Sequence, residues 1–403
     1  MKSAAAAAAD PVRRIDPAAL TAPAAVDRLR VLALGAGVIG AVLLVIGFFV
    51  GPEYFFRSYL VGWVFWTGIA LGSLALLMVQ IMTRGAWGVA GRRVMEAASR
   101  TLPWMLLLFI PLILGFHQLY PAGHEAHELS EGKAAYLSLP GVVGRLVVYF
   151  AVWLFLTFTL NRLSALQDRE ANPDLIARMK RIAAPGIPIW GLCVTFASID
   201  WLMALEPHWY STMYGVWLIG SVGLSAISFL ILMSVWLWRR EPMNHVLRPS
   251  HFHDWGKLML AFTMLWAYFS FSQFLIMWAG NLPEEIVWYK DRIAGGWAYV
   301  ALIIVIFHFA LPFLLLLSRD LKRNPRQLVL VASLMLVMRV VDLFWQVEPG
   351  FPSESQHGAF YWMYAAAPLA IGGIWLWLFL GELKKRPLLP VNDPYLPEAL
   401  AHE

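Results

Sequence analysis

Four acidic residues stand in two matched motifs whose positions could support proton transfer. Asp200 is followed six residues later by Glu206 and a proline, and Asp342 is followed at the same spacing by Glu348 and a proline. Both motifs close long apolar segments, and acids within a bilayer cost about 2.5–3.5 kcal/mol on insertion scales. A carboxylate at a helix C-terminus also meets the negative end of the macrodipole, which disfavours its ionisation. We therefore expect these four groups to hold and pass protons.

Neighbouring titratable residues leave two interpretations of the acids open. Arg339 lies three residues before Asp342, close enough for an ion pair along one helix, and His208 follows Glu206 closely. With the four acids, these residues could form proton half-channels. Alternatively, each acid satisfies helix ends or loop amides, and the pair of Arg339 with Asp342 serves folding alone.

A second set of polar residues could extend such a path. Tyr268 and Gln273 place a hydroxyl and an amide within an apolar segment, and Glu284 and Glu285 follow at its outer mouth. His308 lies inside the next apolar segment and is the remaining titratable group near the acids. A lone histidine in such a segment is otherwise an interior, hydrogen-bonded residue.

Ligands for metals and redox groups are scarce. The single cysteine, Cys193, excludes disulfide frameworks, iron–sulfur clusters and thiolate zinc sites, and only His308 of the histidines lies clearly within an apolar segment. The clusters His124–Glu128 and His251–Asp254 resemble metal loops but lack a complete ligand set, and we interpret them as solvated. The aromatic stripe Trp266–Phe269 could line a quinone pocket or form a membrane-interface belt. We expect this chain to bind no metal or redox cofactor itself.

The composition sets the environment of these residues. The 403-residue chain is 60% hydrophobic and 14% charged, with a mean hydropathy of +0.63. Soluble domains have about 25% charged residues, so a soluble or disordered protein is excluded. The net charge of +5 is more simply explained by membrane topology than by nucleic-acid binding. The sequence therefore predicts an integral membrane protein.

Ten apolar segments are long enough to cross a bilayer as helices. They cover about 31–50, 58–82, 95–119, 142–164, 183–205, 213–238, 255–280, 293–317, 327–348 and 360–382. After Lys2, the tails and connections of one parity, together with the adjoining segment ends, carry 23 Lys and Arg residues, whereas those of the other parity carry four, Arg57, Lys133, Lys290 and Arg292. This asymmetry predicts cytoplasmic N- and C-termini. We expect residues 1–30 to form a disordered cytoplasmic arm, 31–383 the membrane domain, and 384–403 a cytoplasmic tail that is disordered after Leu388.

The matched motifs also suggest an internal duplication. Asn172-Pro173 and Asn324-Pro325 precede the fifth and ninth apolar segments, and these two segments end in the acidic motifs. Because the segments are four apart, they cross the membrane in the same direction. We expect a parallel repeat in which helices 2–5 and 6–9 form two four-helix bundles, with halves of about 55–207 and 213–349.

Several of these segments resemble one protein family. Ser198–Val216, Phe252–Lys257, Trp266–Phe274 and Trp278–Glu285 are similar to signatures of the second quinone-binding subunit of bacterial alternative complex III, a quinol:cytochrome c oxidoreductase. That family is related to the membrane subunits of polysulfide reductase and of the formate-dependent nitrite reductase complex. The resemblance covers about residues 55–385 and agrees with ten helices.

The resemblance implies a multi-pass subunit of the bacterial inner membrane that lacks its own redox cofactor. It implies partners: a homologous membrane subunit, multi-haem cytochromes c, an iron–sulfur protein and a terminal oxidase. Quinol would be oxidised near the outer face of the complex. Independently of the resemblance, the repeated acids of this chain suit proton translocation. Two alternatives are a structural membrane anchor for the complex and a stand-alone ion transporter.

Overall fold

The computed structural model describes residues 20–120, 129–351 and 357–401, and the described chain contains helices without any strand. Ten helical segments are long and apolar enough to cross a membrane, which confirms the expected all-helical, multi-pass architecture. The segment before Leu20 lies outside the described residues, but the first helix already begins at Ala25, within the stretch that we expected to be disordered.

The ten spans follow the predicted segments in order. The first two spans are α1 (Ala25–Val50) and α2 (Pro52–Thr83). The third span is broken into three pieces, α4 (Arg92–Ser99), α5 (Leu102–Leu107) and α6 (Ile110–Leu114). The fourth is α9 (Leu139–Arg169), and the fifth is α10 (Pro173–Trp201) with η4 (Met203–Leu205). The other five are α11 (Tyr214–Trp238), α13 (Pro249–Gly280), α15 (Trp297–Ile304) with η5 (Val305–Ala310) and α16 (Leu311–Leu317), α18 (Pro325–Val347) with η6 (Glu348–Gly350), and α19 (Met363–Leu383). Shorter helices lie between them: α3 (Ala86–Val89), α7 (Phe116–Leu119), α8 (Glu131–Leu137), α12 (Met243–Val246), α14 (Pro283–Ile293), α17 (Arg319–Arg323) and η7 (His357–Phe360). The short helix α20 (Leu396–Ala401) follows the last span.

The two Asn-Pro dipeptides start their helices in the same way. The side-chain oxygen of Asn172 accepts a hydrogen bond from the amide of Asp174 at 2.9 Å, and that of Asn324 accepts one from the amide of Arg326 at 3.1 Å. Each proline occupies the first turn, where its missing N–H is not needed. For this reason α10 begins at Pro173, ten residues before the apolar segment from which we predicted it.

Proline residues explain why two spans are irregular. The third span breaks into α4, α5 and α6, and Pro103 and Pro111 stand in the first turns of the last two pieces. In the eighth span the amide of Leu311 donates to the carbonyl of Ile306, which makes η5 a π-helical turn directly before Pro312. Proline removes a helical hydrogen bond and clashes with the carbonyl four residues earlier, which here belongs to His308. The wider π-helical turn accommodates Pro312.

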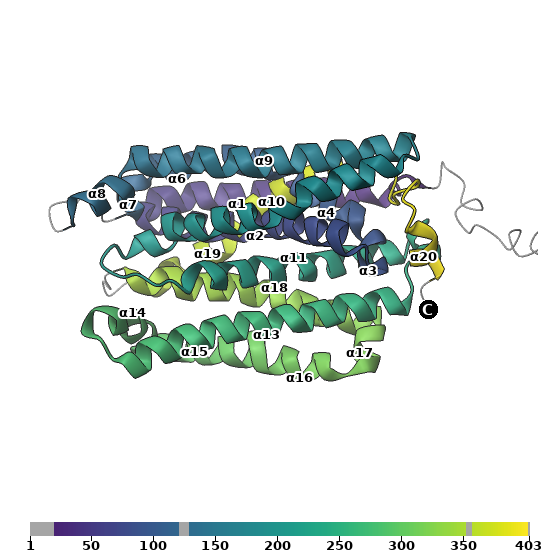
Figure 1. Ribbon diagram of the computed structural model, residues 1–403. Coiled ribbons are helices and arrows are strands. Elements are labelled where there is room, and N and C mark those ends of the chain that lie inside the picture. Colours follow the sequence, from purple (N-terminus) through teal and green to yellow (C-terminus); the bar gives the residue numbers. More distant parts are fainter. Residues whose placement is uncertain (1–19, 121–128, 352–356, 402–403) are drawn as a thin grey trace, which may run out of the picture.

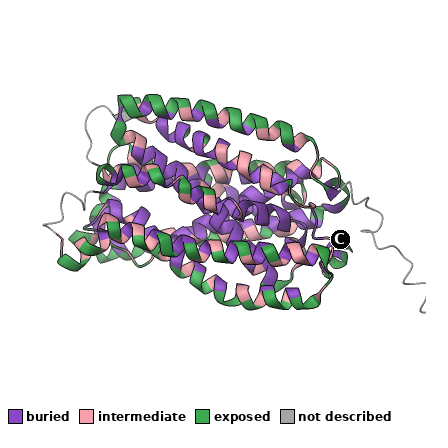
Figure 2. Cartoon of the chain, turned by 90° about the horizontal axis from the view of Figure 1, so that it is seen from above, coloured by how far each residue is buried: buried purple, intermediate pink, exposed green. Residues whose placement is uncertain are grey.

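Two nearly fully buried helices, α2 and α11, contact each other at the centre of the bundle. Helices α9 and α10 pack together on one side, while α13, α15 and α16 lie on the other (Figure 1). Exposed residues follow the outer faces and buried residues fill the middle (Figure 2). Most of the large exposed side chains on these outer faces are apolar, as expected for contact with lipid.

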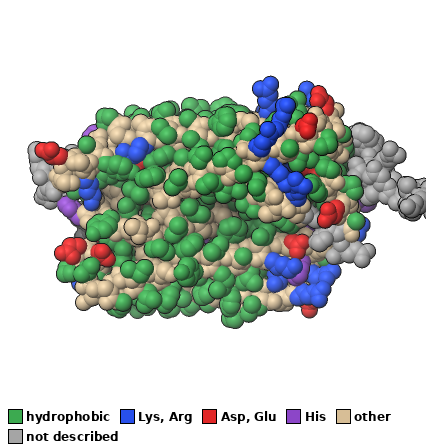
Figure 3. All heavy atoms as spheres, viewed as in Figure 1, with side chains coloured by type: hydrophobic (Ala, Val, Ile, Leu, Met, Phe, Trp, Pro, Cys, Tyr) green, Lys and Arg blue, Asp and Glu red, His purple; other side chains and the backbone are tan. Residues whose placement is uncertain are grey.

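One end of the bundle, which we call the terminal end, holds both Leu20 and the C-terminal helix α20 (Figure 1). The tail after Leu388 is ordered there, because the Arg92 guanidinium meets the Asp393 carboxylate at 2.6 Å and Gln167 donates to the Asn392 carbonyl at 2.8 Å. Our expectation of a disordered tail is therefore wrong. Lys and Arg side chains gather near this end (Figure 3).

Helix α1 is held mainly by close backbone contact with α19. Its buried positions Ala33, Gly37, Gly40 and Gly47 form one stripe of small residues, which lets the two helices approach closely. A Cβ atom built on Gly40 would lie only 2.4 Å from the backbone nitrogen of Ala370. The contact therefore requires glycine at this position.

We predict that Gly40→Ala lowers the stability of the chain by about 1–3 kcal/mol, because the backbones of α1 and α19 must separate. Gly35→Ala is the matched control, since no atom lies within 4 Å of a Cβ at that position. Thermal unfolding of the purified chain in lipid nanodiscs measures both changes. Equal melting temperatures for the two variants would contradict the packing argument.

Candidate functional site

Each of the four acids of the repeated motifs contacts an arginine. The pairs are Asp200 with Arg145, Glu206 with Arg292, Asp342 with Arg339, and Glu348 with Arg57. Truncating one member of a buried ion pair is costly, whereas the intact pair is tolerated. This pairing favours the structural interpretation of the acids wherever both carboxylate oxygens are also satisfied.

Both carboxylate oxygens of Asp200 have hydrogen-bond partners. Its side chain is 1% exposed, and the Arg145 guanidinium donates to both carboxylate oxygens at 2.8–3.2 Å. The Tyr149 hydroxyl donates a further bond at 2.8 Å. Arg145 lies over the ring of Tyr136, 3.6 Å from its centroid. Burial and the charge of Asp200 raise the pKa of Tyr136 to about 12, so this hydroxyl stays protonated at neutral pH.

Glu206 joins the two predicted halves at the end opposite to the termini. Arg292, at the end of α14, donates to its carboxylate at 2.5 Å and to the carbonyl of Gln346 at 2.6 Å. The guanidinium is buried and lies 3.7 Å from the ring centroid of Trp288. Gly350 packs against the same carboxylate so closely that a Cβ there would lie 2.6 Å from Oε1. The two Glu-Pro motifs are therefore neighbours.

Glu348 makes the reciprocal connection. Arg57, a buried residue of α2, lies 3.5 Å from its carboxylate, and the Tyr364 hydroxyl of α19 donates to the other oxygen. The Arg57 guanidinium also stacks 3.8 Å from the ring centroid of Phe351. Each repeated glutamate thus binds an arginine from the other half of the chain, which ties the halves together.

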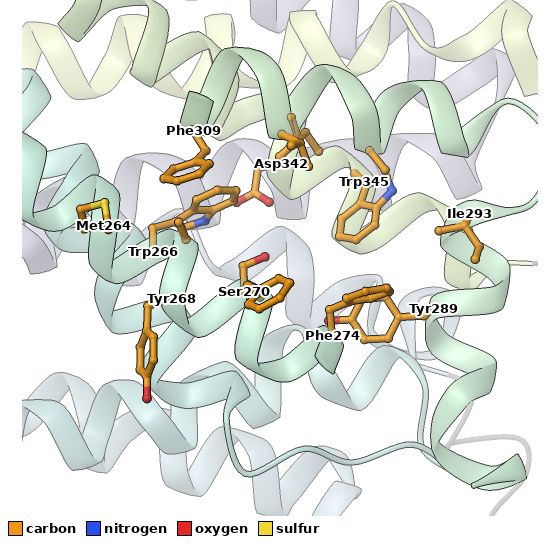
Figure 4. Close-up of a pocket in the computed structure, with 15 residues that line it drawn as sticks. Met264, Trp266, Tyr268, Ser270, Phe274, Tyr289, Ile293, Phe309, Asp342 and Trp345 are labelled. Carbon is orange, nitrogen blue, oxygen red and sulfur yellow. The ribbon is translucent and has the colours of Figure 1, made fainter. Parts of the chain in front are cut away.

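Asp342 differs from the other three acids. Its side chain is fully buried and pairs with Arg339 through Oδ2, but Oδ1 has no hydrogen-bond partner in the described chain. The carboxyl group lies on the wall of a pocket of about 580 Å³. In Figure 4 it points into the space between Trp266, Phe309 and Trp345. Glu348 also lines a cavity, of about 600 Å³, but Arg57 and the Tyr364 hydroxyl contact its two oxygens, whereas Oδ1 of Asp342 has no partner among the described residues.

The pocket opens toward the surrounding lipid between α13 and the eighth span. Tyr268 and Phe271, which line it from α13, are 63% and 61% exposed, and Val305 from η5 is exposed on the other side. Its lining is largely aromatic and aliphatic. A lipid-soluble molecule could therefore enter it sideways from the bilayer and meet a carboxylate at its inner wall.

Further polar groups without partners lie close to this wall. His308 projects from η5 into the core, where neither ring nitrogen has a hydrogen-bond partner among the described residues, and its ring lies 4.3 Å from that of Trp266. The Gln273 carbonyl accepts from Ser211 at 3.2 Å, while its amide nitrogen is unpartnered. Burial raises the pKa of Tyr289, which lines the pocket from α14 and therefore remains a donor.

The other residues of the predicted path lie elsewhere. His208 and Glu284 are exposed at the α14 end, and Glu285 contributes a backbone carbonyl that accepts from Trp209 at 3.1 Å. None of the three lines the pocket. Tyr268 lines its outer edge, and its hydroxyl points away from Asp342 (Figure 4). The structure therefore brings Asp342, Arg339 and His308 together and places Gln273 near Tyr289 of the same pocket. It separates His208, Glu284 and Glu285 from them.

The structure describes only one of the two histidine clusters that we interpreted as solvated. Residues 124–128 lie outside the described residues. His251 is an interior residue rather than a solvated one: its Nδ1 accepts from the Arg248 amide at 3.2 Å, and its Nε2 lies 3.0 Å from the Ala399 carbonyl. In the described part of the chain, no group of three or more His, Cys, Asp and Glu side chains could hold a metal ion.

Three arginines of the ion pairs were missed as site residues from the sequence. Arg145 lies within a predicted apolar span, so the rule that selected the acids would have selected it as well. Arg57 and Arg292 were counted as loop charges, yet both are buried against carboxylates of another helix. No local spacing links them to their partners, because each pair joins residues far apart in sequence.

Comparison with known proteins identifies no relative: no protein-family model matches the chain, and no curated sequence does. The chemistry of the site must therefore be argued from its own geometry.

We predict that Arg145→Leu destabilises the chain by about 3–5 kcal/mol, because it leaves Asp200 buried without its cation. The double variant Arg145→Leu/Asp200→Leu should recover most of this loss, since an apolar pair can replace a buried ion pair. Lys290→Gln, at an exposed position, is the control. Chemical unfolding in detergent measures all three, and a double variant no more stable than the single one would contradict the assignment.

Proposed function

We propose that this chain is an integral membrane subunit of a quinol:cytochrome c oxidoreductase of the alternative complex III type. The resemblance of Ser198–Val216 and Trp266–Phe274 supports this assignment, as does the ten-helix architecture. The observation that carries the proposal is the free Oδ1 of Asp342 on the wall of a lipid-accessible aromatic pocket.

The pocket suits the head group of a quinol. A volume of about 580 Å³ is in the usual range for small-molecule sites, and the aromatic walls offer faces for a planar ring. The isoprenoid tail would extend between Tyr268 and Val305 into lipid. The quinol hydroxyl would donate a hydrogen bond to Oδ1 of Asp342, and Ser270 and Tyr289 supply further polar contacts on the lining.

Asp342 would then accept the proton that the quinol loses on oxidation. In each of two one-electron steps, one O–H bond of the quinol would break, its proton would pass to Oδ1, and one electron would leave to haem or iron–sulfur groups of partner subunits, as the resemblance implies. Asp342 would pass on the first proton before it accepts the second, so that two protons and two electrons leave in all. Arg339 holds Oδ2 and keeps the carboxylate oriented. His308, which is buried and interacts electrostatically with Asp342, is a candidate to relay the proton onward.

We place the other three acids outside the relay, in contrast to our first hypothesis of two half-channels. Glu206 and Glu348 instead connect the two halves of the chain through their arginine partners. We retain the proposal that helices 2–5 and helices 6–9 form two four-helix bundles related as a parallel repeat. The identical capping by Asn172 and Asn324 supports this duplication. Both termini would be cytoplasmic, in a bacterial inner membrane, and the pocket would lie in the outer half of the bilayer.

A purely structural anchor is the competing function, and one observation favours it. All four repeated acids contact arginine, as expected if they only fix helix packing. The free oxygen of Asp342 and the pocket in front of it are what this alternative leaves unexplained. No comparable observation supports a stand-alone transporter.

We predict that Asp342→Asn, in the complex purified with its native partners, lowers quinol oxidation by about 100-fold, because the proton acceptor is lost. The double variant Arg339→Gln/Asp342→Asn removes the same proton-accepting oxygen without leaving an unpaired buried cation, and its quinol oxidation should be equally slow. Asp200→Asn is the matched control, since Arg145 and Tyr149 already bind its carboxylate oxygens, and the change should therefore affect stability alone.

Steady-state oxidation of a short-chain quinol, together with the melting temperature of each complex, separates the two functions. The anchor hypothesis expects the Asp342 and Asp200 variants to lose stability alike, with turnover unchanged per folded complex. Wild-type turnover in the Asp342 variants would overturn the proton-acceptor role.

A further inference from the structure

A second pocket, of about 630 Å³, lies at the terminal end of the bundle and is lined by Trp238, Arg239, Asn244 and Arg326. It is formed where α11 ends, where α12 passes, and where α18 begins. Arg326 precedes Asp342 on α18 by sixteen residues, a helical distance of about 24 Å. The two pockets are therefore separate sites.

The positive charge of this second pocket is not neutralised by the protein. Neither the Arg239 nor the Arg326 guanidinium forms an ion pair or side-chain hydrogen bond with any described residue. The nearby acid Glu241 is exposed and lies 3.9 Å from His245 instead. Burial and the adjacent charge of Arg239 lower the pKa of Arg240, which indicates a local excess of positive charge.

The start of α18 adds to this field. The positive end of the helix macrodipole lies here and attracts anions. The first-turn amides themselves are occupied, because Arg326 donates to the Asn324 side chain and Gln327 and Leu328 donate to the Asn324 carbonyl. The direct contacts to an anion must therefore come from the two guanidinium groups, with the helix dipole adding to their field.

The surface next to Arg326 faces lipid. Leu330 and Val337, four and eleven residues further along α18, lie on the same helical face and are 69% and 61% exposed. Trp238 lines the pocket at the level where aromatic residues commonly mark the membrane interface. An acyl chain lying along this stripe would bring its head group to Arg326.

We propose that this pocket binds the phosphodiester head group of an anionic phospholipid, with its acyl chain along Leu330 and Val337. Arg239 and Arg326 would contact the phosphate, and the Asn244 amide would contact a head-group oxygen. Basic pockets between membrane helices commonly bind such lipids on the side that the charge asymmetry assigns here to the cytoplasm. The inference does not depend on quinol chemistry at Asp342.

We predict that Arg239→Gln/Arg326→Gln weakens phosphatidylglycerol binding roughly 30-fold. Each lost cation removes about 1 kcal/mol of attraction to anionic lipid, and the two together correspond to this change in affinity. The control is Arg162→Gln/Arg178→Gln, which removes the same charge from exposed arginines of the same membrane side but outside the pocket. The full-length chain is reconstituted in phosphatidylcholine nanodiscs with increasing phosphatidylglycerol, and native mass spectrometry counts the retained anionic lipids.

Selective loss of retained phosphatidylglycerol in the pocket variant, with the control unchanged, supports the site. Equal loss in both variants, or loss in neither, overturns it in favour of diffuse surface charge. A parallel titration of inorganic phosphate into phosphatidylcholine nanodiscs distinguishes the source of the phosphate. Phosphate that binds the wild type without lipid, and displaces phosphatidylglycerol, would overturn the assignment to a lipid.

Discussion

The pairing of each repeated carboxylate with a guanidinium, which for three of the four comes from another helix, is the constraint on which much of this structure depends. Asp200 can be buried because α9 carries Arg145 opposite to it, and Glu206 because the connection through α14 returns Arg292 into the core. An unpaired ion at these positions would cost several kcal/mol. The acids therefore require the long-range contacts that define the bundle.

The same constraint explains how the two predicted halves are held in register. Glu206 binds an arginine of the second half, and Glu348 binds Arg57 of the first half, so the two end motifs lock across the central contact of α2 with α11. Apolar packing between lipid-embedded helices supplies little directional preference. Directional ion pairs at one end and close packing through the middle together fix the relative position of the helices.

Asp342 shows how one member of a repeated set can acquire a different chemistry. Its arginine comes from its own helix, one turn earlier, and engages a single oxygen. The second oxygen is left to the space that opens beside η5, where the π-helical turn before Pro312 widens the eighth span. Two repeated aspartates of the same sequence context are therefore a structural ion pair in one half and a candidate proton acceptor in the other.

The sequence alone determined the ten membrane spans, the aspartates and glutamates at their ends, and the Asn-Pro dipeptides that precede α10 and α18, because hydrophobic length and turn residues are local properties. It placed the start of α10 ten residues too late, because apolar length does not register the polar first turns of a helix. It could not determine which arginine pairs with which acid, nor that the tail around Asp393 is ordered against Arg92. The pocket at Asp342 likewise depends on how α13, α14, the eighth span and α18 meet. These features arise from residues far apart in the chain, and only the tertiary structure decides which of them share one low-dielectric space.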